Sequence, residues 1–156
     1  EVRKKEKILL KLSPDINKKD LNEIIFLSER YNITGFILSN LSKKREGLKE
    51  DSNLKYAGGI SGKHTQKRSD ELIKYVFKKT KGKFIIIGSG GVFNGEDAYR
   101  KIKNGASLVQ LITGMIYEGP GIVKKINQEL AELLEKDGYK NIKKAIGSNV
   151  LSKKWK

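Results

Sequence analysis

The stretch "KFIIIGSGGVFNGEDA", residues 83–98, combines an apolar run with a cluster of glycines. Its isoleucine run is typical of a buried strand, and the run ends in the glycine-rich turn GSGG, residues 88–91. Asn94 is a good helix N-cap, so a helix is expected over "GEDAYRKIKNG", ended by Gly105. The stretch therefore predicts a strand, a turn and a helix in succession. On its own it leaves open whether the glycines form only a tight corner or make room for a ligand at the backbone.

The same alternation extends outward in both directions. The continuous apolar character of the strands favours a parallel sheet covered on both faces. The expected strands span residues 7–14, 35–40, 83–91 and 107–111. The expected helices span residues 18–32 (capped by Asn17), 65–80, 95–105 and 122–134, with a further short helix in "NIKKAIG", residues 141–147. Strands that alternate with helices predict parallel β/α units and therefore an α/β fold.

Four such units fit two architectures, a small doubly wound sheet or half of a TIM (β/α)8 barrel. A complete barrel takes about 250 residues, and the chain has 156. The first expected strand also begins almost at residue 1. We therefore expect residues 1–156 to form a single partial domain, made of four β/α units, a C-terminal helix and a basic tail.

Composition limits the classes of function. The chain carries a formal net charge of +15, but its basic residues are spread along the whole length, which favours solvated lysine-rich helix faces over a nucleic-acid patch. Binding to polyanions or anionic lipid is the alternative. The absence of cysteine excludes disulfides and thiolate metal sites. No apolar run reaches the roughly 18 residues of a membrane span.

The carboxyl ends of the expected strands supply the candidate site, because ligands of parallel α/β folds gather there. The ends carry one cation, hydroxyls, an amide and bare backbone, but no pair of carboxylates. This set suits an anionic, planar, hydrogen-bonding ligand better than hydrolysis. Lys11 is either a ligand contact or a snorkelling side chain, and Ser39 and Asn40 either contact a ligand or start a turn. The turn 88–91, together with a short helix in "TGMIYEG", residues 113–119, predicts a barrel phosphate site.

Other polar residues receive no functional role. His64 is the single histidine, so no histidine metal cluster or serine triad can form within the chain, and we expect no metal. We expect His64 to lie in a loop near "GISGK". Four carboxylates are expected at helix ends or on the surface: Asp15, Glu23, Asp70 and Asp97. Trp155 is expected in the basic tail.

Several segments together resemble dihydroorotate dehydrogenase of the quinone-linked class 2 type. They are "LLKLSPD", "GFILSN", "GGISGK", "IIIGSGGVFNGEDAYRKIKNGASLVQL", "YEGP" and "GYKNIKKAIG". The resemblance implies the C-terminal half of that family's TIM barrel. It also implies FMN-dependent oxidation of dihydroorotate to orotate in pyrimidine biosynthesis, with quinone as electron acceptor and a location at the mitochondrial inner membrane.

The resemblance also assigns roles to residues. Lys11 and Ser39 would lie beside the flavin ring, with the charge of Lys11 stabilising negative charge on it. Asn40 would bind orotate, and Leu41 stands next to it where the family usually has a hydroxyl residue. The FMN phosphate would be held by Ser61, Gly62, Gly90, Gly91 and the backbone of Ile112 and Thr113. In this interpretation Gly91 lacks a side chain because the phosphate approaches its N–H.

The same resemblance places the family's catalytic serine base and quinone site upstream of these residues. We therefore expect no catalytic residue in this chain, no turnover by the chain alone, and a partner that supplies the other half of the barrel. Two alternatives stay open. One is a non-catalytic half-barrel that binds FMN or phosphate, and the other is a structural subunit.

Overall fold

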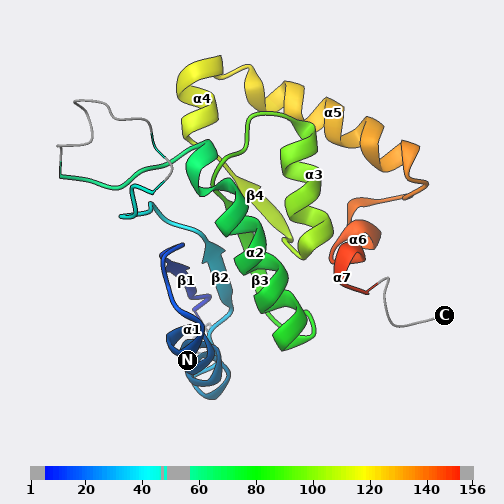
Figure 1. Ribbon diagram of the computed structural model, residues 1–156. Coiled ribbons are helices and arrows are strands. Elements are labelled where there is room, and N and C mark those ends of the chain that lie inside the picture. The colour runs from blue at the N-terminus through cyan, green and yellow to red at the C-terminus, as the bar shows by residue number, and fades with distance from the viewer. Residues whose placement is uncertain (1–5, 47, 49–56, 152–156) are drawn as a thin grey trace.

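The computed structural model describes residues 6–46, 48 and 57–151 (Figure 1). The expected basic tail and Trp155 lie outside the described residues. A four-stranded parallel sheet has the strand order β1-β2-β3-β4, with Phe36 paired to both Leu10 and Ile86. Its strands are β1 (Leu9–Leu12), β2 (Gly35–Leu38), β3 (Ile85–Ser89) and β4 (Leu108–Gln110). The four strands predicted from the sequence are thus confirmed.

The helices follow the predicted positions and caps. The side chain of Asn17 accepts a hydrogen bond from Asp20 N at 2.9 Å at the start of α1, and Asn94 accepts one from Asp97 N at 2.8 Å at the start of α3. Gly105, with φ +122°, ends α3 as predicted. The helices are α1 (Lys18–Arg30), α2 (Lys63–Thr80), α3 (Gly95–Asn104), α4 (Thr113–Glu118), α5 (Ile122–Lys136), α6 (Ile142–Ala145) and α7 (Ser148–Leu151).

Strand order decides between the two predicted architectures. The strands pair in the order of the chain, which is the order of a (β/α)8 barrel, whereas a doubly wound sheet reverses its order at a switch point. Figure 1 agrees, since α2 and α3 lie over the same face of the sheet. The described residues therefore form four consecutive β/α units of barrel type.

The prediction that both faces of the sheet are covered is wrong for the described residues. Side chains that point toward the helices are fully buried, as at Phe36, Leu38 and Ile86. Alternate positions point to the opposite face, where Ile85 is 41% and Leu108 is 58% exposed. The continuous apolar runs reflect strands built for burial on both sides, but only the helical side is covered within this part of the chain.

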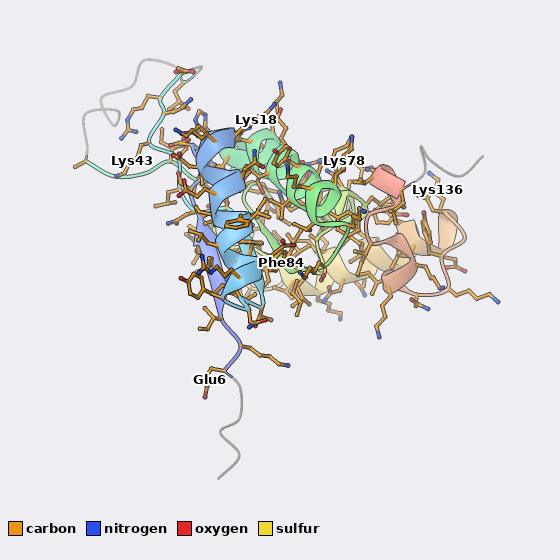
Figure 2. All side chains as sticks on the ribbon, turned by 90° about the horizontal axis from the view of Figure 1, so that it is seen from below. Glu6, Lys18, Lys43, Lys78, Phe84 and Lys136 are labelled. Atoms are coloured by element: carbon orange, nitrogen blue, oxygen red, sulfur yellow. The ribbon has the colours of Figure 1, made fainter. Side chains whose placement is uncertain are left out.

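The core lies between the sheet and the helices. The rings of Phe36 and Phe84 meet edge to face with centroids 5.0 Å apart, and Leu72 and Val76 of α2 pack into the same cluster. Figure 2 shows Phe84 among packed side chains, whereas labelled lysines such as Lys18, Lys78 and Lys136 lie at the periphery. Those three lysines are exposed, as expected for solvated helix faces.

The C-terminal region differs from the prediction of one short helix. Two short helices, α6 and α7, follow α5. Gly147 separates them, because its φ of +74° is a left-handed conformation that interrupts an α-helix. Its N–H donates to the carbonyl oxygen of Ile102 at 3.0 Å, which ties the segment to α3. A Cβ at this position would overlap the ring of Phe77, so glycine is required for space as well as for conformation.

We predict that Gly147→Ala destabilises the chain more than Gly138→Ala. Both glycines have nearly the same φ, +74° and +75°, and each alanine bears the left-handed penalty of about 1–2 kcal/mol. A methyl group at Gly138 would meet no atom within 4 Å, whereas at Gly147 it meets Phe77. That overlap adds about 1–3 kcal/mol. Urea unfolding measures the difference, and equal free energies of unfolding for the two variants would contradict this packing.

Candidate functional site

One pocket lies at the carboxyl ends of the four strands. All ten residues predicted to bind cofactor or substrate line it, although they come from four separate β/α units. Their roles remain predictions, but their meeting at one place is a finding. The lining residues predicted from the sequence are Lys11, Ser39, Asn40, Leu41, Ser61, Gly62, Gly90, Gly91, Ile112 and Thr113.

Backbone hydrogen bonds beyond the strand ends fix one side of the pocket. The N–H of Ser39 donates to the carbonyl oxygen of Ser89 at 2.8 Å, and the N–H of Asn40 donates to that of Leu12 at 2.8 Å. Ser39 is buried and its hydroxyl donates to the carbonyl oxygen of Asn40 at 3.3 Å, while the side chains of Asn40 and Lys11 stay exposed at the pocket. This side presents an ammonium group, a hydroxyl and a carboxamide to a bound molecule.

The beginnings of two helices form the opposite side. α2 starts directly after Gly62, and α4, the short helix predicted over residues 113–119, starts at Thr113. The hydroxyl of Thr113 donates to that of Ser61 at 2.9 Å, which joins the two helix starts. Neither N-cap residue makes a side-chain hydrogen bond to its helix. Free backbone N–H groups and positive helix-dipole ends favour an anion here.

The glycines at 90 and 91 are needed by the chain itself. Their φ values are +115° and +68°, which side chains rarely adopt. A Cβ at Gly90 would lie 2.8 Å from Thr65 Oγ1, and one at Gly91 would overlap Gln66, both in the first turns of α2. The structure thus accounts for the missing side chain of Gly91 by packing against α2, a different reason from the phosphate approach expected from the sequence.

Five further lining residues were given no contact by the sequence. Three of them, Ser89, Leu111 and Gly114, lie in strand-end segments that the sequence does single out, so only Thr65 and Val92 escape prediction altogether. The hydroxyl of Thr65, for instance, is buried and donates to the carbonyl oxygen of Gly62 at 2.9 Å, which fixes the start of α2. Each of the five adjoins a predicted site residue or follows one by three positions on a helix. They are Thr65, Ser89, Val92, Leu111 and Gly114.

Two predictions about polar residues, His64 and Asp70, need correction. His64 lies in the first turn of α2 rather than in a loop, with its Nε2 3.2 Å from the carbonyl oxygen of Lys44. Asp70 is neither at a helix end nor on the surface. It lies within α2, and its carboxylate pairs with Arg100 at 2.6 Å and with Lys101 at 2.7 Å. Asp97 is in the first turn of α3 as expected, but it is buried.

Lys101 departs from the expectation that the lysines lie on solvated helix faces, because its side chain is fully buried. Burial lowers the pKa of its ammonium group, and the Asp70 carboxylate opposes that effect. A signal was present in the sequence. Positions 98, 101, 102 and 105 share one helix face, so Lys101 lies in the stripe that faces the core.

The loop that follows β2 is held by Asp15. One carboxylate oxygen accepts from the Ser42 hydroxyl at 2.7 Å and the other from Lys43 N at 2.7 Å. Ser42 in turn pairs with Ile60 through two backbone hydrogen bonds, 2.8 and 2.9 Å long. Because Leu41 adjoins Ser42 and Ser61 adjoins Ile60, Asp15 supports two lining segments of the pocket from outside it.

The pocket has a distinct chemical character. Its lining residues contribute one cation and no carboxylate, with hydroxyls, an amide and glycine backbone making up the polar surface. Among the described residues, no group of three or more His, Cys, Asp or Glu side chains is arranged to hold a metal. No helix in the same part of the chain is long and apolar enough to cross a membrane. The donors fit an anionic group such as a phosphate.

Comparisons with known proteins point in one direction. A family model described as dihydroorotate dehydrogenase matches residues 1–134. The dihydroorotate dehydrogenase (quinone) of Trichodesmium erythraeum is 44% identical over 151 residues, which cover 92% of this chain and 40% of that protein. The enzyme of Oryza sativa, named as quinone-type and mitochondrial, is 41% identical over 143 residues, or 91% of this chain and 30% of that protein.

Solved structures agree with the sequence relatives. The crystal structure of ligand-free DHODH from Eimeria tenella superimposes with a TM-score of 0.89 at 30% identity, covering 94% of this chain and 41% of that one. A second structure from the same organism, in complex with ferulenol, gives a TM-score of 0.88 at 31% identity, covering 94% and 39%. The chain thus spans about 40% of the length of the proteins it matches in these comparisons.

We predict that Asp15→Asn lowers the free energy of unfolding by about 1–2 kcal/mol at neutral pH, because one of the two hydrogen bonds to a charged acceptor is lost. Burial raises the pKa of Asp15, but the bonds from Lys43 and Ser42 and the charge of Lys44 outweigh it and set the pKa below 3.8. Urea unfolding at several pH values measures both effects.

The sign of the pH dependence follows from that lowered pKa. The stabilisation by ionised Asp15 is present above the unfolded-state value of 3.8 and is lost as pH falls through the lower folded-state pKa. The gap between the unsubstituted chain and Asp15→Asn should therefore narrow below pH 3.8. Glu23→Gln, at an exposed position of α1, serves as control. A gap that stays constant down to about pH 2 would contradict the assigned role of the Asp15 charge.

Proposed function

Because the chain belongs to the dihydroorotate dehydrogenase family, of the quinone type, we propose that it is part of an FMN-dependent enzyme that oxidises dihydroorotate to orotate in pyrimidine biosynthesis. In this proposal the chain supplies the FMN phosphate site and part of the orotate site. The observation that carries the proposal is the meeting of all ten predicted site residues around one pocket without carboxylates.

The phosphate of FMN would lie between the starts of α2 and α4. Helix N-termini and glycine backbone offer N–H donors there, and the hydroxyls of Ser61 and Thr113 are already joined at 2.9 Å. A dianionic phosphate gains from such donors because they need no reorganisation on binding. The proposed phosphate contacts are Ser61, Gly62, Gly90, Gly91 and the backbone of Ile112 and Thr113.

When bound, FMN supplies the chemistry of accepting an electron pair from the substrate. Lys11 lies on the open face of the sheet, on the side of the pocket away from the helix starts, and its ammonium group would stabilise negative charge on the ring. The backbone of Ser39 is held by its bond to Ser89, and its hydroxyl, which donates to the carbonyl oxygen of Asn40 at 3.3 Å, would lie beside the ring.

The substrate would contact the end of β2. The carboxamide of Asn40 offers both a donor and an acceptor, which match the alternating carbonyl and N–H groups of a pyrimidine. Its backbone is fixed by the bond to Leu12, while its side chain remains exposed at the pocket. Leu41 is 45% exposed and adds an apolar contact where a hydroxyl would otherwise hydrogen-bond.

We further propose that residues 1–156 are one partial domain completed by the other half of a barrel. Among the described residues, the uncovered sheet face supports this, because Ile85 and Leu108 are 41% and 58% exposed there, and so do the outer sides of β1 and β4, which pair with no further strand. The completing half would supply the catalytic base and the contact with quinone. No nucleic-acid partner is part of the proposal.

The proposed location is the mitochondrial inner membrane. The name of the Oryza sativa relative includes the mitochondrion, whereas the relatives from Trichodesmium erythraeum and Nostoc punctiforme carry the quinone-type name without it. A second candidate function is a non-catalytic half-barrel that binds FMN. The apolar Leu41 favours it, since it removes a polar substrate contact but leaves the phosphate side of the pocket unchanged.

The proposal is tested by combining the chain with the amino-terminal part of the Trichodesmium erythraeum relative. We expect bound FMN and quinone reduction that depends on dihydroorotate. Lys11→Met should lower the rate by about 100-fold, the usual cost of losing one charge-stabilising group in a site. Lys7→Met, at an exposed position before β1, is the matched control and should leave the rate unchanged.

The outcomes separate the two candidates. Bound FMN without dihydroorotate oxidation would support the non-catalytic half-barrel and contradict the enzymatic proposal. Absence of bound FMN from a well-folded mixture would contradict both. An equal loss of rate in Lys11→Met and Lys7→Met would remove the assigned role of Lys11.

A further inference from the structure

The buried lysine of α3 has no part in the proposed function so far. Lys101 Nζ lies 2.7 Å from Asp70 Oδ1 and 3.0 Å from Ser69 Oγ, and all of its side chain is inaccessible to solvent. Taking an ammonium group out of water is costly even when it is paired. An uncharged side chain of similar length would fill the space at lower cost, so packing alone does not account for a lysine here.

Ser69 connects that charge to the sheet. Its Oγ accepts from Lys101 and lies 2.7 Å from the carbonyl oxygen of Ser89 and 3.0 Å from that of Leu38. The carbonyl oxygen of Ser89 also accepts from the N–H of Ser39 at 2.8 Å. The ammonium group is therefore linked, through one hydroxyl, to the peptide groups at the carboxyl ends of β2 and β3.

The stem of the lysine is fitted to the same strand end. A Cβ at Gly88 would lie 3.0 Å from Lys101 Cδ and 3.0 Å from Ile73 Cδ1, so the glycine leaves room for the stem to pass under β3. Of the three glycines in the turn at 88–91, Gly88 is thus the one that makes space for Lys101. Within the turn, Gly88 lies against Lys101, whereas Gly90 and Gly91 lie against α2.

We propose that Lys101 is a positioning residue for the pocket and acts through Ser69 on the Ser89–Gly90 peptide. A carbonyl oxygen that accepts hydrogen bonds from polarised donors makes the N–H of its own peptide group a stronger donor. That N–H belongs to Gly90, one of the residues proposed to hold the FMN phosphate. The inference rests on the proposed function for its ligand, but its structural part concerns this chain alone.

The charged residues around Lys101 keep other partners when its ammonium group is removed. Asp70 also binds Arg100, whose Nε lies 2.6 Å from Asp70 Oδ2, so Asp70 keeps a partner when the ammonium group is removed. Arg100 binds Asp97 as well, at 2.9 Å, and Asp97 accepts from the backbone N–H of Phe93 at 3.0 Å. Lys101→Met keeps the stem and this second set of bonds, and therefore isolates the ammonium group.

The test compares FMN with riboflavin, which lacks the phosphate. Dissociation constants for both are measured by flavin fluorescence with the full chain, and with the chain combined with the amino-terminal part of the relative. Lys101→Met and Ser69→Ala should weaken FMN binding about fivefold, the effect of about 1 kcal/mol, and change riboflavin binding less than about twofold. Lys103→Met, on the same helix but paired with the exposed Asp137, should change neither.

A second readout does not depend on flavin. Hydrogen exchange of the backbone amides should be faster at Ser39 in both variants, since its bond to the Ser89 carbonyl loses support, and unchanged in α5. If the unsubstituted chain binds no flavin in either preparation, the proposed function fails, and this exchange measurement alone decides the structural inference. Equal weakening of FMN and riboflavin, or exchange at Ser39 that matches the unsubstituted chain, would overturn the positioning role.

Discussion

Parallel pairing of β1 to β4 in chain order determines where the helices and the pocket lie. Strands that run in the same direction bring all their carboxyl ends to one edge. Lys11, Asn40, Gly91 and Thr113 are far apart in the sequence, and only this pairing brings them to one pocket. The same pairing forces each connection to cross the sheet as a helix, which places the helix starts beside the strand ends.

The glycine-rich turn after β3 shows how packing and binding share one segment. Gly88 leaves room for the stem of Lys101, while Gly90 and Gly91 adopt positive φ values and lie against Thr65 and Gln66. Glycine at these positions is therefore required before any ligand is considered. The bare backbone that results is also what an anion needs, so the packing of α2 and α3 prepares the proposed phosphate site.

Much of the fold is predictable because its signals are local. The isoleucines of β3, the caps at Asn17 and Asn94 and the terminating Gly105 each depend on a few neighbouring residues, and the structure confirms each of them. The pocket residues are predictable from strand ends together with the family resemblance. The choice between the two architectures requires the strand order, which no local pattern contains.

The errors have three different physical origins, of which one is long-range pairing. A lysine on a helix is predicted to be exposed to solvent unless its carboxylate partner is known. The partner of Lys101 is Asp70, which is 31 residues away in the sequence, so no local pattern reveals it. The glycines of "GISG" favour a loop around His64, yet α2 begins at once after Gly62. The uncovered sheet face escapes prediction because apolar strands look the same whether the second layer belongs to this chain or to a partner.

We propose that the pocket at the strand ends holds FMN by its phosphate. A crystal structure of the chain with FMN, alone or combined with the amino-terminal part of a relative, tests it most directly. We expect the phosphate between the starts of α2 and α4, within hydrogen-bond distance of the Gly91 backbone and Thr113, and the flavin ring toward Lys11. A phosphate bound elsewhere on the chain, or a ring with no contact to Lys11, would contradict it.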